Sequence, residues 1–388
     1  MQPYRGIDLL DIESQLTDDE RQVRDTVRDF VEAEALPAVV PHFREGTFPL
    51  ELVPRMGELG LFGAHLEGYG CAGLGPVAYG LVMQELERAD SGYRSFASVQ
   101  SSLAMTAIHE FGTEEHRERY LPDMAAGRVL GAFGLTEADH GSDPAGMETH
   151  AVETADGFTL NGGKMWITNA GIADVVVVWA KLGDAIRGFL VDTTLAGVWR
   201  EDVHNKLSMR MSVTSALFLE DVRVGEDALL PGTRGLGSAL ACLNAARYSI
   251  VWGVCGAAAD CLHTAIEYTK EREQFGRPLA SFQLVQQKLA DMATSLSKAQ
   301  LLALQLGRLK AAGTLHWSHV SMAKYSNTLA ALEIARTSRD LLGAAGITDD
   351  LSPMRHAMNL ETVHTYEGTQ HMHQLILGRH LTGINAIS

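Results

Sequence analysis

Hydrophobic and polar positions follow two different periods along the chain. Between Thr17 and roughly Arg128 the apolar residues recur at helical spacing, and Thr17 with Glu20 matches the capping-box pattern that opens a helix. From about Thr149 to Val224 the pattern changes to short β-rich runs, at 157–160, 164–168, 175–182, 187–191 and 215–224. Turn signals at 156–157, 161–163 and 169–171 separate some of these runs. The first third is therefore predicted to be helical and the middle to be a small antiparallel sheet.

Helical spacing returns after Pro231 and Gly232. Long runs cover about 236–270, 282–311 and 316–342, and a last run extends from Gln370 to Leu381. An all-helical, all-β, all-helical order implies separate layers and not a doubly wound sheet. We predict an α+β fold with an N-terminal helical domain over 1–130, a middle antiparallel β domain over 131–235 and a C-terminal four-helix-bundle domain over 236–388. No G-x-G-x-x-G opens a helix after a strand, so a Rossmann domain that binds nicotinamide is not expected.

Composition places the chain among ordinary globular proteins. It has 388 residues, of which 46% are hydrophobic and 21% are charged, enough for two or three domains. The longest apolar runs, such as 175–180, are too short to cross a bilayer, so no membrane association is expected. The acid-rich stretch from Asp8 to Glu20 has the character of neither a secretory signal nor a mitochondrial presequence. We expect a bacterial cytoplasmic protein, although a mitochondrial matrix protein without its presequence would look the same.

Charge and cysteine content exclude two further classes of function. The net charge of −16 disfavours nucleic acid as a partner, because counterion release needs a basic face. The four cysteines show no C-x-x-C pair and no zinc spacing. Three of them, Cys242, Cys255 and Cys261, lie in a small-residue-rich helical region, and the fourth is Cys71. All four are predicted to be reduced thiols.

The segment TYEGT at 365–369 places a carboxylate, Glu367, beside a glycine and two hydroxyls, just ahead of a helical run. A carboxylate held there can serve as a general base. A rival reading places His364, Glu367 and His371 on one helical face as metal ligands. We favour the base and predict no metal site, because Gly368 breaks or starts a helix there.

Other segments allow both a structural and a functional reading. FGLTE at 133–137 and WIT at 166–168 are either strand residues that fill a β core or part of a binding site. REQFG at 272–276 is either a polar connection between two helices or a segment that contacts phosphate. Arg94, in a segment of small apolar residues, is either ion-paired with Glu87 or a receptor for an anion.

Taken together, FGLTE, WIT, REQFG and TYEGT resemble the flavin-dependent acyl-CoA dehydrogenases, and the similarity runs from about Leu16 to the last residues. SGYRS at 91–95 and KLSMR at 206–210 narrow the resemblance to the glutaryl-CoA dehydrogenase branch. The resemblance implies FAD as cofactor, an acyl-CoA substrate and an electron-transfer flavoprotein as electron acceptor. It also implies a homotetramer, and a flavin site that neighbouring chains share requires at least two chains.

The resemblance also implies roles for individual residues. Glu367 is expected to remove the α-proton of the thioester, and a backbone N–H near it and a ribityl hydroxyl of the flavin are expected to stabilise the enolate. Expected in the flavin site of one subunit are Phe133, Leu135, Thr136, Ser142, Trp166, Ile167, Thr168 and Thr369. Expected to reach the adenosine diphosphate from a neighbouring subunit are Arg272, Gln274, Phe275, Gln283, Asp340, Leu341, Leu342, Gly343 and Ala344. Where the family usually has Gly-Gly-Asn before Gly-Ile, this chain has Gly343 followed by Ala344-Ala345.

For the substrate, the resemblance implies that Arg94 binds the distal carboxylate of glutaryl-CoA and that Glu87 orients Arg94 by hydrogen bonding. Further substrate contacts are expected from Ser95, Ser142, Leu243, Asn244, Arg247, Tyr366 and Gly368. Phe96 replaces a small residue of the branch, and its ring is expected to shorten or reshape the acyl pocket. The predicted reaction is oxidation of glutaryl-CoA followed by loss of carbon dioxide to give crotonyl-CoA.

Two alternatives stay open at this stage. The first is a dehydrogenase of the same fold that acts on another short or branched acyl-CoA without decarboxylation, in which Arg94 has only a structural role. The second is a non-catalytic flavoprotein or acyl-CoA-binding scaffold, which would have no reason to keep Glu367.

Overall fold

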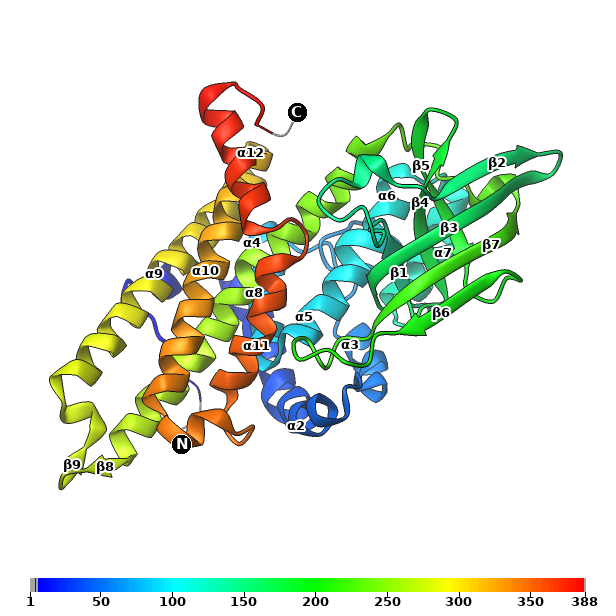
Figure 1. The fold of residues 1–388 in the computed structure, drawn as a ribbon. Helices are drawn as coiled ribbons and strands as arrows, with labels where there is room; N and C mark the ends of the chain where they lie inside the picture. The colour runs from blue at the N-terminus through cyan, green and yellow to red at the C-terminus, as the bar shows by residue number, and fades with distance from the viewer. Residues whose placement is uncertain (1–3, 5, 387–388) are drawn as a thin grey trace.

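The computed structural model describes Tyr4 and residues 6–386. Figure 1 shows a β-sheet at one end of the molecule and a bundle of long helices at the other, with N-terminal helices between them. The helical, β and helical parts follow one another along the chain as predicted.

The N-terminal part consists of short helices around the almost completely buried α4. The capping box is confirmed, because the Thr17 N–H donates to Glu20 Oε2 over 2.9 Å and the Glu20 N–H donates to Thr17 Oγ1 over 3.2 Å. Two stretches, Val31–Ala35 and Val99–Met105, have π-helical hydrogen bonding. The helices are α1 (Asp18–Phe30), α2 (Leu36–Glu45), α3 (Val53–Glu58), α4 (Pro76–Ala89), α5 (Ser91–Ser98), α6 (Thr106–Phe111) and α7 (Glu114–Ala125).

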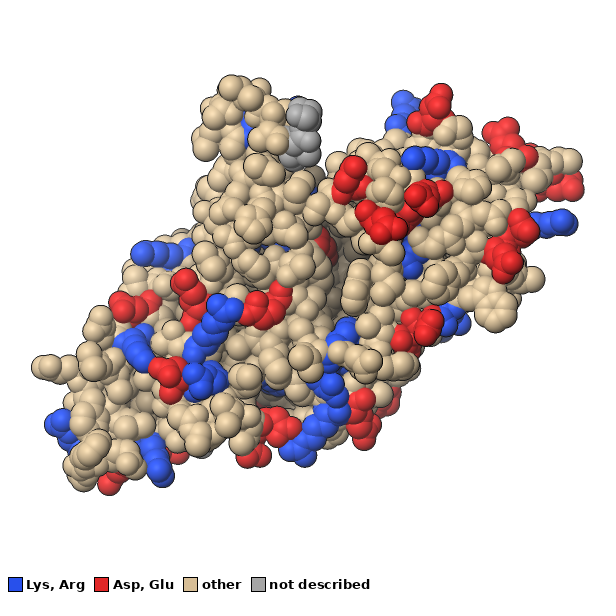
Figure 2. All heavy atoms as spheres, in the orientation of Figure 1, with Lys and Arg blue, Asp and Glu red and all other residues tan. Residues whose placement is uncertain are grey.

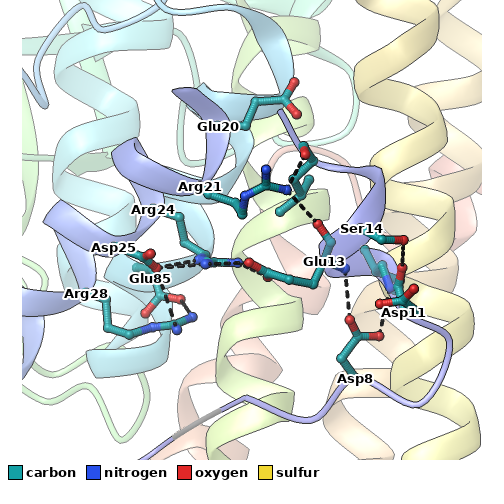
Figure 3. A network of polar contacts seen from close by, with 12 residues as sticks. Asp8, Asp11, Glu13, Ser14, Glu20, Arg21, Arg24, Asp25, Arg28 and Glu85 are labelled. Carbon is teal, nitrogen blue, oxygen red and sulfur yellow. Dashed lines mark hydrogen bonds and ion pairs between the residues drawn. The ribbon is translucent and has the colours of Figure 1, made fainter. Parts of the chain in front are cut away.

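Ion pairs fasten α1 to the segment before it and to α4 (Figure 3). Arg24 Nη2 donates to Glu13 Oε1 over 3.0 Å. Arg28 Nη2 lies 2.7 Å from Oε1 of Glu85, whose side chain is fully buried. Arg88 Nε lies 2.8 Å from the other oxygen of the same carboxylate. Glu85 therefore joins α1 to α4 inside the N-terminal part.

The middle part is one seven-stranded sheet with the order β1-β4-β2-β3-β7-β6, in which β5 pairs with β4. Most strand pairs are antiparallel as predicted, but β4 pairs in parallel with both β1 and β2, so the sheet is mixed. The strands are β1 (Gly131–Gly134), β2 (His150–Thr154), β3 (Gly157–Thr168), β4 (Val175–Leu182), β5 (Ala185–Asp192), β6 (Val198–Asp202) and β7 (Thr214–Val224).

The predicted turn at 161–163 is wrong, because β3 runs straight through it. A register shift between Leu160 and Gly162 marks a β-bulge there. Gly162 has φ 143°, and a Cβ at this position would lie 2.5 Å from Thr149 Oγ1. The glycine that looked like a turn residue therefore allows Thr149, just before β2, to approach β3 closely.

Up to residue 386, where the described chain ends, the C-terminal part contains five α-helices, one more than predicted. They are α8 (Leu236–Glu271), α9 (Gln283–Ala311), α10 (Trp317–Leu341), α11 (Ser352–Thr365) and α12 (Gln370–Thr382). The hairpin of β8 (Glu273–Gln274) and β9 (Arg277–Pro278) joins α8 to α9. By length and composition α8 could cross a membrane, but 83% of its apolar window is buried inside the protein, as in a core helix. Within the described residues all four cysteines are free, and Cys71 alone is only half-buried.

The helix that the pattern missed, α11, joins the three parts of the chain. Arg355 Nη1 lies 2.5 Å from Asp90 Oδ2, in the turn between α4 and α5. Asn359 Nδ2 donates to the same oxygen over 2.8 Å. The Met209 N–H, in the loop between β6 and β7, donates to Asn359 Oδ1 over 2.8 Å. The buried face of α11 is therefore partly polar, which explains why it shows no clear apolar period.

Candidate active site

Glu367 lies in the short loop between α11 and α12. Its backbone is left-handed, with φ 52°, and Gly368 follows with φ 94°. The Thr369 hydroxyl accepts from the Met372 N–H over 3.3 Å and so caps α12. The loop therefore separates α11 from α12, and the backbone of Glu367 is not helical.

The Glu367 carboxyl group is half-buried and surrounded by cations. Its Oε2 is buried and has no hydrogen-bond partner among the described residues. Arg247 Nε donates to the backbone carbonyl of Glu367 over 2.7 Å. Burial raises the pKa of Glu367, while Arg94, Arg247 and Lys324 act to lower it. A carboxylate with a raised pKa and an unpaired oxygen is suited to accept a proton.

Arg94 lies on α5, and its side chain is completely buried. Its Nε donates to Glu87 Oε2 over 2.6 Å, which confirms the predicted hydrogen bond. Its Nη2 donates to the Tyr366 hydroxyl. No described residue accepts a hydrogen bond from Nη1. Burial alone would lower the pKa of Arg94, but Glu87 and Tyr366 outweigh it and raise the pKa, so the guanidinium stays charged.

Ser91 completes this arrangement, because its hydroxyl donates to Glu87 Oε1 over 2.9 Å. Ser95 is also buried on α5. The ring of Phe96 stacks on Phe48 at 4.2 Å between centroids and is tilted against Phe62 at 5.7 Å. The structure thus gives Phe96 a packing role in the N-terminal core, and its effect on the acyl pocket stays a prediction.

The two predicted flavin-lining segments lie side by side. The Met165 N–H donates to the Thr136 carbonyl over 2.9 Å, which connects 133–136 to the end of β3. Lys164 Nζ strengthens the junction by donating to the Leu135 carbonyl over 3.1 Å and to Glu137 Oε1 over 2.8 Å. Trp166 has φ 64° beside a bulge in β3, and its side chain is 56% exposed. A half-exposed indole on a rigid sheet offers a flat apolar wall to a planar ring. Around it Phe133, Leu135 and Ile167 are buried, while Thr136 and Thr168 are half-buried.

The residues predicted to contact a neighbouring chain's flavin lie at the far end of the molecule. Arg272, Gln274 and Phe275 belong to the β8–β9 hairpin, which points away from the sheet in Figure 1. Phe275 is 93% exposed. Lys288 Nζ lies 2.5 Å from Asp340 Oδ2, which ties the start of α9, with the exposed Gln283, to the end of α10. Of the stretch from Asp340 to Ala344, Leu342 is buried, while Asp340, Gly343 and Ala344 are exposed and Leu341 is half-buried.

The predicted contacts of the CoA chain are divided between two places. Ser142 lies exposed in the loop between β1 and β2. Arg247 Nη1 donates to Asn244 Oδ1 over 3.1 Å, and the half-buried Leu243 precedes them on α8. Figure 2 shows a hollow between the helical bundle and the β part. Because Arg247 also donates to the backbone carbonyl of Glu367, it lies beside the candidate base and closer to the reacting end of the substrate than the sequence suggested.

Sequence reasoning missed Lys324 and His373. Lys324 Nζ donates to the carbonyls on both sides of Glu367. His373 is fully buried beneath the loop, and burial, with Lys324 and Arg247, lowers its pKa to about 3, so it is neutral. A Cβ at Gly368 would lie 2.9 Å from His373 Nε2. The available signal was a single lysine on the apolar face of a helix.

Three family models match consecutive parts of the chain. They are the acyl-CoA dehydrogenase N-terminal domain over residues 17–128, the middle domain over 132–222 and the C-terminal domain over 233–382. The chain belongs to the acyl-CoA dehydrogenase family. This confirms both the fold class and the resemblance predicted from the motifs.

Solved structures refine the relationship of this acyl-CoA dehydrogenase to others. A glutaryl-CoA dehydrogenase from Mycobacterium smegmatis is 53% identical with a TM-score of 0.97, over 99% of this chain and 100% of the other. A glutaryl-CoA dehydrogenase from the same organism, in complex with FADH2, is 50% identical with a TM-score of 0.98 over the whole of both chains. The mitochondrial short-chain specific acyl-CoA dehydrogenase of Bos taurus is 34% identical over 375 residues, 95% of this chain and 91% of the other.

The protein is therefore an FAD-dependent acyl-CoA dehydrogenase. Its residues fit that cofactor, because the joined segments around Trp166 offer a half-exposed aromatic ring and carry the half-buried hydroxyl residues Thr136 and Thr168. These residues would hold the ring system of the cofactor. Among the described residues, no three His, Cys, Asp or Glu side chains lie where they could share a metal ion.

Proposed function

We propose that the protein oxidises and decarboxylates glutaryl-CoA to crotonyl-CoA and carbon dioxide, and that its electrons pass to an electron-transfer flavoprotein. The observation that carries the proposal is the buried Arg94 guanidinium, held by Glu87 and Tyr366 with Nη1 free of described partners. A simple fatty acyl chain would leave this group facing hydrocarbon, at a cost of roughly 1–3 kcal/mol or more. The identity of 50–53% to glutaryl-CoA dehydrogenases supports the same substrate.

In the first step Glu367 takes the α-proton of the thioester. The pair of electrons of the broken C–H bond enters the enolate, and a hydride leaves the β-carbon to give glutaconyl-CoA. FAD, when bound, supplies the acceptor for that hydride. Arg94 holds the distal carboxylate throughout, so the acyl chain lies extended between the guanidinium and the base.

In the second step the new α,β double bond is adjacent to the γ-carbon, which carries the distal carboxylate. Loss of carbon dioxide leaves its electron pair in a dienolate, and the proton taken by Glu367 returns to the γ-carbon to give crotonyl-CoA. One carboxyl group thus acts first as base and then as acid, for which a raised pKa is suitable. The lining cations Arg247 and Lys324 favour the anionic states on this path.

The test is an anaerobic titration of the flavin-loaded protein with glutaryl-CoA, in which flavin bleaching is followed and the CoA product is identified by mass. Bleaching with crotonyl-CoA as product is expected. Glutaconyl-CoA as product would overturn the decarboxylation. Absence of bleaching with glutaryl-CoA, together with bleaching by butyryl-CoA or branched acyl-CoAs, would favour the alternative substrate class and give Arg94 a structural role.

We also propose a homotetramer in the bacterial cytoplasm, with the flavin site completed by a second chain. The distance of the β8–β9 hairpin from the sheet of its own chain, and the exposure of Phe275, support this assembly. Sedimentation velocity of the holoprotein tests it, and a monomer that retains FAD would contradict a shared site.

A further inference from the structure

Two buried cations hold three consecutive carbonyl groups around the candidate base. Lys324 Nζ donates to the Tyr366 carbonyl over 2.9 Å and to the Gly368 carbonyl over 2.8 Å. Arg247 Nε donates to the carbonyl of Glu367 between them over 2.7 Å. The backbone of the loop is thus fixed from α10 and α8 together.

Lys324 is in an unusual position for this purpose alone. It is 1% exposed and lies on the apolar face of α10, in line with Val320, Asn327 and Ala331. No carboxylate of the described residues lies within ion-pair distance of its Nζ. Burying an ammonium without a carboxylate is costly, so such a lysine is expected only where its bonds have a function.

The bonds act on a strained residue. A left-handed φ of 52° is unfavourable for glutamate, because the Cβ atom then lies too close to the following carbonyl oxygen. Such a conformation persists only when its surroundings determine it. Hydrogen bonds to the carbonyls before and after Glu367 are suited to do so, because they prevent either neighbouring peptide from rotating.

We propose that Lys324 is a positioning residue for the base, and that its bonds to the carbonyls of Tyr366 and Gly368 hold the Glu367 carboxyl group over the α-carbon of the substrate. This inference rests on the proposed role of Glu367 as the base. Lys324 touches neither the substrate nor the cofactor in this role.

The ammonium also acts through its charge. Ionisable groups face it from every side: Glu367 in the loop, Arg247 on α8, Arg94 on α5, His364 on α11 and His373 on α12. Burial lowers the pKa of Lys324 to about 7, with Arg247 and Arg94 acting in the same direction and Glu367 opposing. Because Lys324 in turn acts to lower the pKa of Glu367, its loss should make the carboxylate harder to form.

The test uses the flavin-loaded protein and an acyl-CoA analogue with sulfur in place of the β-carbon. This probe can lose its α-proton but cannot transfer a hydride, so the absorbance of its enolate against the oxidised flavin reports proton removal alone. The pH midpoint of that absorbance is measured for wild type, Lys324→Met and Lys324→Arg, together with kcat and KM for glutaryl-CoA. Lys310→Met is the matched control, because Lys310 is another lysine whose pKa is lowered by burial, to about 8. Lys310 lies on α9, with its Nζ over the ring of Tyr248 on α8.

In Lys324→Met the midpoint should rise by about one pH unit or more and kcat should fall at least about tenfold, with KM little changed. Lys324→Arg should recover part of both, and Lys310→Met should match wild type. A wild-type midpoint and kcat in Lys324→Met would overturn the inference. If Lys324→Met does not retain flavin, Lys324→Gln, which keeps N–H donors without the charge, gives the same comparison with the same criteria.

Glu367→Gln is measured beside these variants. If it still forms the enolate, the proposed base is wrong and the inference about Lys324 falls with it. If Glu367→Gln is inactive while Lys324→Met behaves as wild type, only the positioning role fails.

Discussion

The Arg94 guanidinium donates a hydrogen bond to the Tyr366 hydroxyl, although the two residues are 272 positions apart. Tyr366 immediately precedes Glu367, so the group proposed to anchor the substrate is attached to the loop that carries the proposed base. The proposed binding group at one end of the acyl chain and the proposed base at the other are therefore joined by a direct contact between α5 and the α11–α12 loop.

Tyr366→Phe should weaken turnover of glutaryl-CoA and affect butyryl-CoA less. Loss of a hydrogen bond to a charged group costs about 1.5–3 kcal/mol, so kcat/KM with glutaryl-CoA should fall about tenfold to hundredfold. Steady-state kinetics with both substrates measure the ratio. Equal losses for the two substrates would show that the tyrosine serves the loop and not the carboxylate.

Arg94→Gln should abolish the preference for the dicarboxylic substrate. Because this change alone leaves the buried Glu87 carboxylate without its partner, the double variant Glu87→Gln/Arg94→Gln is the proper control for stability. The double variant should melt at a higher temperature than Arg94→Gln and be equally poor with glutaryl-CoA. A double variant that recovers glutaryl-CoA turnover would rule out Arg94 as the carboxylate receptor.

Glu367→Gln should lower the rate of flavin reduction by about a hundredfold to ten-thousandfold, the usual contribution of a general base. Binding of the product crotonyl-CoA, followed by the shift of the flavin spectrum, should remain. Stopped-flow reduction with glutaryl-CoA is the measurement, and undiminished reduction would remove Glu367 from its role.

The pH dependence follows from the raised pKa of Glu367, which burial causes. The first step needs the carboxylate, so its rate should fall as the pH drops through this raised value. The same shift affects stability in the opposite sense, because above the ordinary pKa the unfolded chain ionises more readily than the folded one. Glu367→Gln should therefore melt at a higher temperature than wild type near pH 8, with a gain that shrinks toward pH 4. A gain that is independent of pH would contradict this account.

Lys164 and Glu137 form a buried pair beneath the predicted flavin wall, 2.8 Å apart with side chains 0% and 7% exposed. Burial acts to raise the pKa of Glu137, but the Glu148 N–H and Lys164 outweigh it and hold the pKa near 2. Lys164→Met should cost about 3–5 kcal/mol because it leaves a buried charge alone. The double variant Lys164→Met/Glu137→Gln should recover part of this, as measured by urea unfolding. Full additivity of the two changes would mean that the pair is not coupled.

The sequence predicted what depends on local pattern. Thr17 and Glu20 predicted the start of the first helix. The ends of α8 and α9 were predicted to within a residue or two, because their sequences are periodic over many turns. The pattern failed where tertiary contacts replace hydrophobic burial, as on α11 with its buried Arg355, His356 and Asn359. It also failed at Gly162, where a glycine serves close strand packing and not a turn.

Only some residues of the candidate site were predicted from the sequence. The motifs around Glu367, Arg94 and Trp166 carry a resemblance that fixes the residue types, and the bond from Arg94 to Glu87 followed from it. Lys324 could not be found in this way, because a lone lysine in a helix does not reveal which carbonyls it will reach. That information exists only once α10 and the loop after α11 are packed together.

The polar face of α11 has a thermodynamic consequence. Through Arg355 and Asn359 one helix binds the α4–α5 turn and the loop after β6, so opening any one part of the chain leaves buried charged or amide groups of the others without partners. Calorimetry of the holoprotein should show one cooperative unfolding transition for the N-terminal, middle and C-terminal parts together, although they differ in architecture. In Arg355→Met the helical and β parts should begin to melt apart, and the first to loosen would be the loop that holds the base.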